Sequence, residues 1–101
     1  MPKPSTMMIV DSIRAIPPGR VASYGAVAAM ASIPWGARQV VRVLHSMSAA
    51  EGLPWWRILR KDGSIALPEG SGRELQAGLL RAEGVEVDED GRVDMGRYGL
   101  G

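Results

Sequence analysis

The sequence predicts a mainly helical α+β fold of the winged helix-turn-helix class, with small β-hairpins beside the helices. Two observations predict it. Two short helical segments meet at a proline-containing joint, and short apolar runs broken by glycine-containing turns follow them. The chain has 101 residues, of which 46% are hydrophobic, which suits one hydrophobic core. We therefore expect residues 1–101 to form a single domain.

The first helix is expected to start near Ser5 or Thr6, because either hydroxyl can cap a helix N-terminus. Its apolar face consists of three isoleucines at helical spacing: Ile9, Ile13 and Ile16. The Pro-Pro-Gly run at 17–19 then ends it.

Two further helices follow. Ser23 opens a short alanine-rich helix that continues to about Ser32. Pro34 breaks the chain, and a third helix is expected from about Trp35 to Met47. These two helices and their short joint predict the helix-turn-helix unit.

The third helix has two distinct faces. Its apolar face is predicted to contain Ala37, Val40, Val41, Leu44 and Met47. Its basic stripe contains Arg38, Arg42 and His45. No acidic residue occurs between Asp11 and Glu51, whereas a merely solvated surface normally mixes charges of both signs. The stripe therefore indicates a surface for an anionic partner, with an ordinary solvated face as the alternative.

The rest of the chain is expected to mix short strands with one helix. Residues 49–52 are predicted to be a loop, and residues 55–67 a β-hairpin that turns at Asp62-Gly63. A last helix is predicted over Arg73–Glu83, with three leucines turned inward: Leu75, Leu79 and Leu80. A second small hairpin is predicted around residues 88–91, flanked by three valines: Val85, Val87 and Val93.

Charge is distributed unevenly along the chain, although the net charge is only +1. Residues 1–68 hold eight Lys or Arg and three Asp or Glu, whereas residues 69–101 hold four and eight. An anionic ligand should therefore meet the first two-thirds of the chain, unless the asymmetry is accidental.

Several functional classes are disfavoured. The absence of cysteine excludes disulfides, thiolate metal sites and a cysteine nucleophile, and it favours a cytoplasmic location. We expect no signal peptide, no membrane span, no metal and no cofactor. His45 is the only histidine and has no nucleophile near it in the pattern, so we expect no catalytic residue.

The stretch "LPWWRI" at 53–58 is the most unusual feature of the chain. On a strand, Trp55 and Trp56 would point to opposite faces, so that one packs in the core and the other is free to line a cleft. An exposed indole face offers stacking to a nucleic-acid base or to an apolar ligand.

The order of motifs resembles the DNA-binding domain of the O6-alkylguanine-DNA alkyltransferases, and more closely the alkyltransferase-like proteins, in which tryptophan replaces the acceptor cysteine. The resemblance covers nearly the whole chain and is carried by "IPPGRVASYGAVA" (16–28), "IPWGARQV" (33–40), "LPWWRI" (53–58), "DGSIAL" (62–67), "LLRAEGV" (79–85) and "GRVDMGRYGL" (91–100).

The resemblance implies a set of residues that handle DNA. Tyr24 would help to turn a nucleotide out of the stack, and Arg38 would enter the duplex and fill the gap. The third helix would enter the minor groove, where small Ala37 permits close approach. The remaining DNA contacts implied in this way are Gln39, Arg42 and Ser23.

The resemblance also implies a lesion pocket with Trp55 as a wall at the position of the acceptor cysteine. Leu44 and Ile58 would complete its apolar lining, Trp56 would pack behind it, and Arg57 would be structural. Because an indole lacks the nucleophilicity of a thiolate, alkyl transfer should be absent.

The sequence departs from the family pattern at several positions. Trp56 stands where relatives usually have histidine, and Glu83, which matches a relay glutamate, has lost that partner. Glu83 is then either an acceptor for the Trp56 indole N–H or, as we favour, a residue of the helix end. Met47 replaces a common asparagine, and residues 67–69 lack the arginine that covers the lesion in some relatives.

The resemblance thus implies a monomeric, non-enzymatic protein. It would recognise O6-alkylguanine in double-stranded DNA by nucleotide flipping and flag it for nucleotide excision repair proteins. Two alternatives stay open. A winged-helix transcription regulator would usually dimerise and read a palindrome, and we see no spare dimerisation helix. A catalytic repair protein would need another nucleophile.

Overall fold

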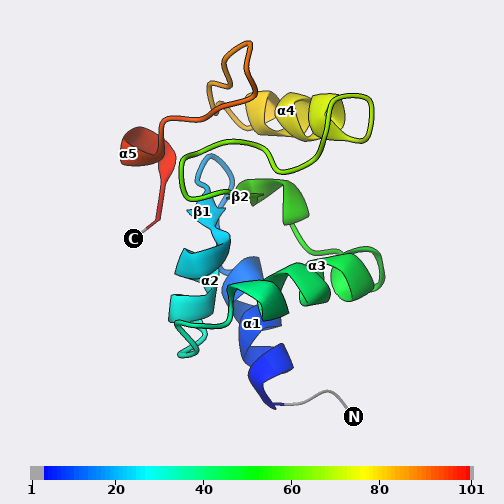
Figure 1. The fold of residues 1–101 in the computed structure, drawn as a ribbon, viewed down its shortest axis with the longest axis vertical. Helices are drawn as coiled ribbons and strands as arrows, with labels where there is room; N and C mark the ends of the chain where they lie inside the picture. The colour runs from blue at the N-terminus through cyan, green and yellow to red at the C-terminus, as the bar shows by residue number, and fades with distance from the viewer. Residues whose placement is uncertain (1–3, 101) are drawn as a thin grey trace.

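The computed structural model describes residues 4–100 and measures 40 × 26 × 20 Å along its principal axes. The elements in chain order are α1 (Pro4–Arg14), β1 (Ala22–Ser23), α2 (Tyr24–Met30), α3 (Ala37–Glu51), the 3₁₀ helix η1 (Trp55–Arg57), β2 (Ile58–Leu59), α4 (Arg73–Ala82) and α5 (Met95–Tyr98). Figure 1 shows α1, α2 and α3 packed together at one end, α4 and α5 at the other, and the two short strands between them. The prediction of a mainly helical fold with a helix-turn-helix unit is confirmed.

The three N-terminal helices enclose the first of two hydrophobic clusters. The isoleucines expected to face inward are fully buried there: Ile9, Ile13 and Ile16. The expected cap is wrong, because α1 already begins at Pro4 and therefore contains Ser5 and Thr6. Proline suits the first turn of a helix, where its missing N–H has no intrahelical partner to lose.

Ser23 caps α2 as predicted, since its Oγ accepts a hydrogen bond from the Ala26 N–H at 3.0 Å. Helix α3 begins at Ala37, two residues later than predicted, and continues to Glu51. The predicted loop at 49–52 is therefore wrong. Its two alanines favour helix, and the helix ends only at Gly52, which adopts the left-handed conformation with φ of 59°.

The buried face of α3 differs in part from the expected one. Val40 and Val43 are the residues of α3 that are buried, whereas Val41 is 40% exposed. Leu44 and Met47 are partly buried against the same cluster. The buried stripe is thus rotated by part of a turn, which leaves Val41 on the side of α3 that faces away from the core.

The predicted hairpin over 55–67 is wrong, although its turn is present. Residues 55–57 form η1, and β2 pairs in parallel with β1, with Ala22 opposite Ile58 and Ser23 opposite Leu59. The turn around Asp62 is closed by the Arg60 N–H, which donates to the Ser64 carbonyl at 2.9 Å. Gly63 has a φ of +88°, and any side chain there would collide with the Val93 carbonyl.

The C-terminal segments form the second hydrophobic cluster, to which Leu59, Leu80 and Val85 contribute. Helix α4 matches its prediction to within one residue, but Leu75 is 59% exposed, and Gln76 and Ala77 are buried instead.

The predicted second hairpin exists only as a turn, in which the Asp88 N–H donates to the Arg92 carbonyl at 3.0 Å. Its antiparallel partner is a distant residue, because Arg92 bridges to Ser64. The short helix α5 was not expected, and it buries Tyr98. None of the helices formed by residues 4–100 is long and apolar enough to cross a membrane.

A candidate lesion groove between two clusters

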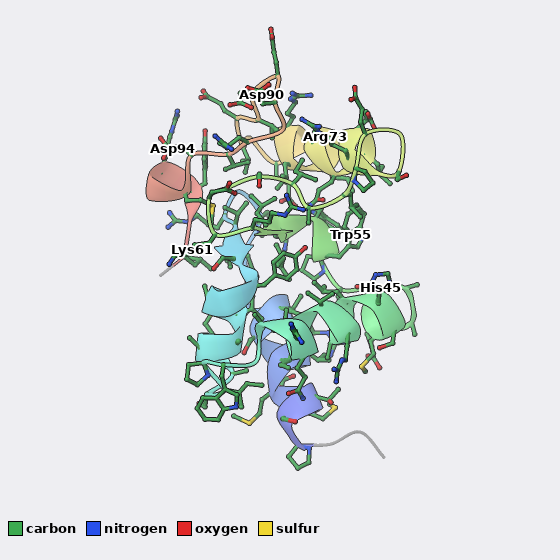
Figure 2. The ribbon with its side chains drawn as sticks, viewed as in Figure 1. His45, Trp55, Lys61, Arg73, Asp90 and Asp94 are labelled. Carbon is green, nitrogen blue, oxygen red and sulfur yellow. The ribbon has the colours of Figure 1, made fainter. Side chains whose placement is uncertain are left out.

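A groove of about 1060 Å³ runs between α3 on one side and η1 with α4 on the other. We call it the lesion groove, after the lesion pocket that the sequence resemblance implies. Four of the residues expected in a lesion pocket line it: Tyr24, Leu44, Trp55 and Ile58. Trp56, which is expected to pack behind the pocket, lines it as well. These residues come from three separate parts of the chain. Figure 2 places Trp55 on the turn next to α3, with His45 on the neighbouring part of that helix. His45, from the basic stripe, lines the same groove.

Trp55 and Trp56 meet edge to face, with ring centroids 6.0 Å apart and ring planes at 87°. They occupy a 3₁₀ turn and not a strand, so the expected projection to opposite faces is wrong. Consecutive side chains of such a turn diverge by about a third of a circle, which lets both indoles reach one groove. The Trp56 indole nitrogen is buried and has no hydrogen-bond partner among residues 4–100.

Arg57 anchors this turn from behind. Its Nε donates to Glu83 Oε1 at 3.0 Å, and its Nη1 donates to the Ile16 carbonyl at 2.8 Å. The side chains of Arg57 and Glu83 are only 11% and 15% exposed. The hydrogen bonds from Arg57 lower the pKa of Glu83. The Trp56 indole lies close enough to Glu83 to lower that pKa by a smaller amount, although no hydrogen bond of normal geometry joins the two side chains. Arg57 is therefore a structural residue, as expected.

Gln76 is a residue that the sequence prediction missed. It is 3% exposed, and its Nε2 donates to the carbonyl oxygens of Trp56 at 3.0 Å and Ile58 at 3.1 Å. It thereby ties α4 to the wall of the lesion groove, which it also lines. The one available signal was a polar residue at an inward position of an otherwise leucine-rich helix.

Tyr24 stands at the start of α2, half-buried, where the lesion groove meets a second hollow of about 680 Å³. We call this second hollow the side cavity, and it is also lined by Ala37, Lys61 and Leu100. Burial raises the pKa of the Tyr24 hydroxyl, and the positive charge of Arg60 partly opposes that rise. Tyr24 is thus a neutral phenol at physiological pH.

The residues expected to contact DNA have different surroundings. Arg38 and Arg42 are exposed on α3, and neither forms an ion pair within residues 4–100. Gln39 instead donates through Nε2 to Ser5 Oγ at 2.8 Å, which ties α3 to α1. Ser23 is engaged as the cap of α2.

The lining of the lesion groove determines which kind of ligand fits it. The chain has no cysteine, and the described residues hold no group of three side chains that could ligate a metal ion. The lesion groove offers indole faces, aliphatic side chains and a phenol, which suit a flat and largely apolar ring.

Residues 4–85 match the family described as 6-O-methylguanine DNA methyltransferase, DNA binding domain. The chain is 38% identical over 92 residues to a DNA base-flipping protein of Vibrio parahaemolyticus, with 91% of each protein covered. It is 30% identical over 93 residues to alkyltransferase-like protein 1 of Schizosaccharomyces pombe, covering 91% of this chain and 83% of that protein.

Solved structures give the same result for the fold. Atl1 of Schizosaccharomyces pombe, in complex with damaged DNA containing O6-carboxymethylguanine, superposes with a TM-score of 0.87 at 25% identity, covering 100% of this chain and 99% of the other. Mycobacterium tuberculosis OGT in complex with DNA has a TM-score of 0.69 at 23% identity, over 82% of this chain and 51% of the other. The chain belongs to the family of the 6-O-methylguanine DNA methyltransferase DNA-binding domain, among relatives named DNA base-flipping and alkyltransferase-like proteins.

Proposed function

We propose that this chain recognises O6-alkylguanine in double-stranded DNA by holding the flipped base in the lesion groove, and that it performs no alkyl transfer. One observation carries the proposal. Side chains from three distant parts of the chain, all expected from the sequence, line one groove beside the exposed arginines of α3. The Schizosaccharomyces pombe relative that superposes on this chain was solved with DNA containing O6-carboxymethylguanine, which supports the same class of ligand.

Flipping needs a compensating contact, because removing a base from the stack costs a few kcal/mol. In the proposed complex, Arg38 enters the duplex at the vacated position, where its planar guanidinium stacks on the orphaned partner base. Its exposed position in the first turn of α3 and its lack of an ion pair within residues 4–100 leave it available for this role. Tyr24 forms the edge over which the nucleotide turns.

The proposed groove retains its ligand because its wall is unreactive. In the frame of the alkyltransferases, Trp55 occupies the position of the acceptor cysteine, and an indole carbon framework does not accept an alkyl group under conditions that suit a thiolate. The base is held by stacking, worth about 1–3 kcal/mol for each base–aromatic contact. A protein that binds without chemistry must pass its lesion on, and we propose nucleotide excision repair proteins as the onward partners.

The test compares two duplexes of one sequence that differ only in guanine or O6-methylguanine. Trp55 and Trp56 line the lesion groove, so a base stacked there should change their fluorescence, and a Trp35→Phe background removes the signal of the 84% exposed third tryptophan. We expect tighter binding of the damaged duplex. Equal affinity for both duplexes, with preference for one sequence, would instead support a transcription regulator.

Trp55→Ala should weaken binding of the O6-methylguanine duplex by about 1–3 kcal/mol, because it removes one stacking face. Leu75→Ala is the matched control, since Leu75 is 59% exposed on α4 and lies outside the groove lining. Retained lesion preference in Trp55→Ala would refute the wall assignment. Mass spectrometry of the protein after incubation with alkylated DNA decides the enzymatic alternative, because a persistent alkyl adduct would reveal transfer.

A further inference from the structure

The lesion groove has an uneven charge. Its lining contains no aspartate and no glutamate, and Arg60 is its one lysine or arginine. The remaining lining is aliphatic, aromatic or neutral polar apart from His45. An otherwise apolar groove with one guanidinium at its edge is suited to a flat ligand that carries a negative charge at one end.

Arg60 is free to meet such a ligand. Its side chain is exposed and makes no hydrogen bond or ion pair with any residue between 4 and 100. The carboxylate of Asp62, two residues further along the chain, is within reach of the positive charge of Arg60, which contributes a small part of the lowering of the Asp62 pKa, but it is hydrogen-bonded to other groups. Its Oδ1 accepts hydrogen bonds from the Ser64 N–H and hydroxyl at 3.0 and 2.6 Å, and its Oδ2 faces Arg92 at 3.5 Å.

The strand pair determines where Arg60 stands. Ser23 is paired with Leu59, so Tyr24 and Arg60 are the residues that directly follow two parallel strands, and both lie at the same end of the strand pair. Both side chains line the lesion groove and the side cavity, and Arg60 influences the ionisation of Tyr24. The charge of Arg60 therefore acts on the phenol of Tyr24 at the place where the lesion groove meets the side cavity.

We propose that Arg60 makes the lesion groove selective for O6 adducts of guanine that end in a carboxylate. This inference rests on the proposed function and names the ligand class within it. A base seated between Trp55 and Tyr24 presents its O6 substituent to the groove edge, where a carboxylate accepts paired hydrogen bonds from the planar guanidinium. An uncharged substituent of the same shape gains stacking and no ion pair.

The test uses an isosteric pair of adducts. One duplex carries O6-carboxymethylguanine and the other O6-carbamoylmethylguanine, whose amide has the same shape and no charge. At about pH 8, where histidine side chains are ordinarily neutral, we expect the carboxylate duplex to bind about two- to five-fold more tightly, which is the range for a solvent-accessible ion pair. Arg60→Gln should bring that ratio to one, and Arg60→Lys should retain part of it.

Lys61→Gln is the matched control. Lys61 is the next residue and is also basic, but it lines only the side cavity and not the lesion groove. It should change the affinities for both adducts by the same factor and leave their ratio intact. The Arg60 side chain makes no bond within the described chain, so the unfolding midpoint of Arg60→Gln should equal that of the unmodified protein.

The possible results separate the two proposals. Equal loss of affinity for both adducts and for undamaged DNA in Arg60→Gln would mean that Arg60 binds a backbone phosphate, and it would overturn the inference alone. A ratio of one in the unmodified protein, together with preference for O6-methylguanine over guanine, would also overturn the inference alone. Equal binding of guanine and all adducts would refute the proposed function and the inference with it.

Discussion

At the scale of single residues, the pair formed by Arg57 and Glu83 holds the tryptophan turn in place. Both side chains are largely shielded from water, and Arg57 also donates to the Ile16 carbonyl. The pair thus joins the groove wall, the end of α4 and the segment after α1. Removal of one partner would leave the other charge poorly solvated, which is more costly than loss of an exposed pair.

Glu83→Gln should lower the free energy of unfolding by roughly 2–4 kcal/mol at neutral pH, measured by chemical denaturation. Arg57 lowers the pKa of folded Glu83 below its ordinary value of 4.5. The stability that the pair contributes is therefore complete above that value and is lost as pH falls through the lower folded-state pKa. The difference between the two proteins should shrink in that acidic range.

Glu86→Gln is the control for this measurement, because the Arg97–Glu86 pair is 60% and 77% exposed. Its loss should change stability by less than about 1 kcal/mol. If both substitutions have the same small effect, the Arg57–Glu83 pair does not anchor the turn.

Individual groove residues differed in how well the sequence could predict them. Tyr24, Leu44 and Ile58 were singled out through motif resemblance, and all three line the lesion groove. Gln76 was not found, because its role depends on two main-chain carbonyls of a distant turn. Arg60 was not found either, since its place in the groove follows from a strand pairing that the sequence pattern did not indicate.

At the scale of elements, α3 combines a structural role with the proposed contact to DNA. Val40 and Val43 fix it against the first hydrophobic cluster, and Gln39 ties its first turn to α1. These contacts leave Arg38 and Arg42 on the exposed side. A helix held this firmly presents its arginines in a fixed arrangement, which lowers the entropic cost of binding a duplex.

Arg38→Ala should weaken binding of the lesion duplex by about 1–2 kcal/mol and reduce the preference for damage, because the gap left by the flipped base stays empty. Arg42→Ala, as the contrasting variant, should weaken damaged and undamaged binding alike, as expected for a phosphate contact. Fluorescence titration measures the affinities of both variants, and circular dichroism checks that each variant keeps its fold. Unchanged lesion affinity in Arg38→Ala would remove its proposed role in the duplex.

Helices were predicted better than strands for a physical reason. The isoleucine spacing of α1 and the Ser23 cap are local signals, and both are confirmed. Apolar and polar residues alternate along segment 55–67 in a way that favours a hairpin. Its strand β2 nevertheless pairs with β1, which lies far away in the chain. Hydrogen bonds to the Pro54 and Trp56 carbonyls, the second from Gln76, stabilise a 3₁₀ turn at the start of the segment. Pairing between distant segments leaves little trace in local periodicity.

At the scale of the whole molecule, the lesion groove is the seam between two hydrophobic clusters. The basic first two-thirds of the chain supply α3 and most of the groove, whereas the acidic last third forms the far end, where Figure 2 shows Asp90. This charge distribution orients the protein so that a polyanion meets the groove side first.

Raising the salt concentration should weaken binding of both damaged and undamaged duplexes, because phosphate contacts release counterions. The ratio of the two affinities should change much less, since stacking inside the groove does not depend on counterion release. A titration series at several salt concentrations measures both quantities. If the affinities do not depend on salt, Arg42 is not a phosphate contact.

Because β1 and β2 form a short parallel pair, the insertion of one residue should have very different effects at different places in the chain. An inserted residue in the exposed outer turn at 68–71 would only enlarge a surface loop. One inserted between Trp55 and Ile58 would shift the pairing by a residue and exchange the faces of Ile58 and Leu59, each of which is now buried in a different cluster. Evolution can therefore lengthen the outer turn freely, whereas the spacing between the indoles and the strand is fixed.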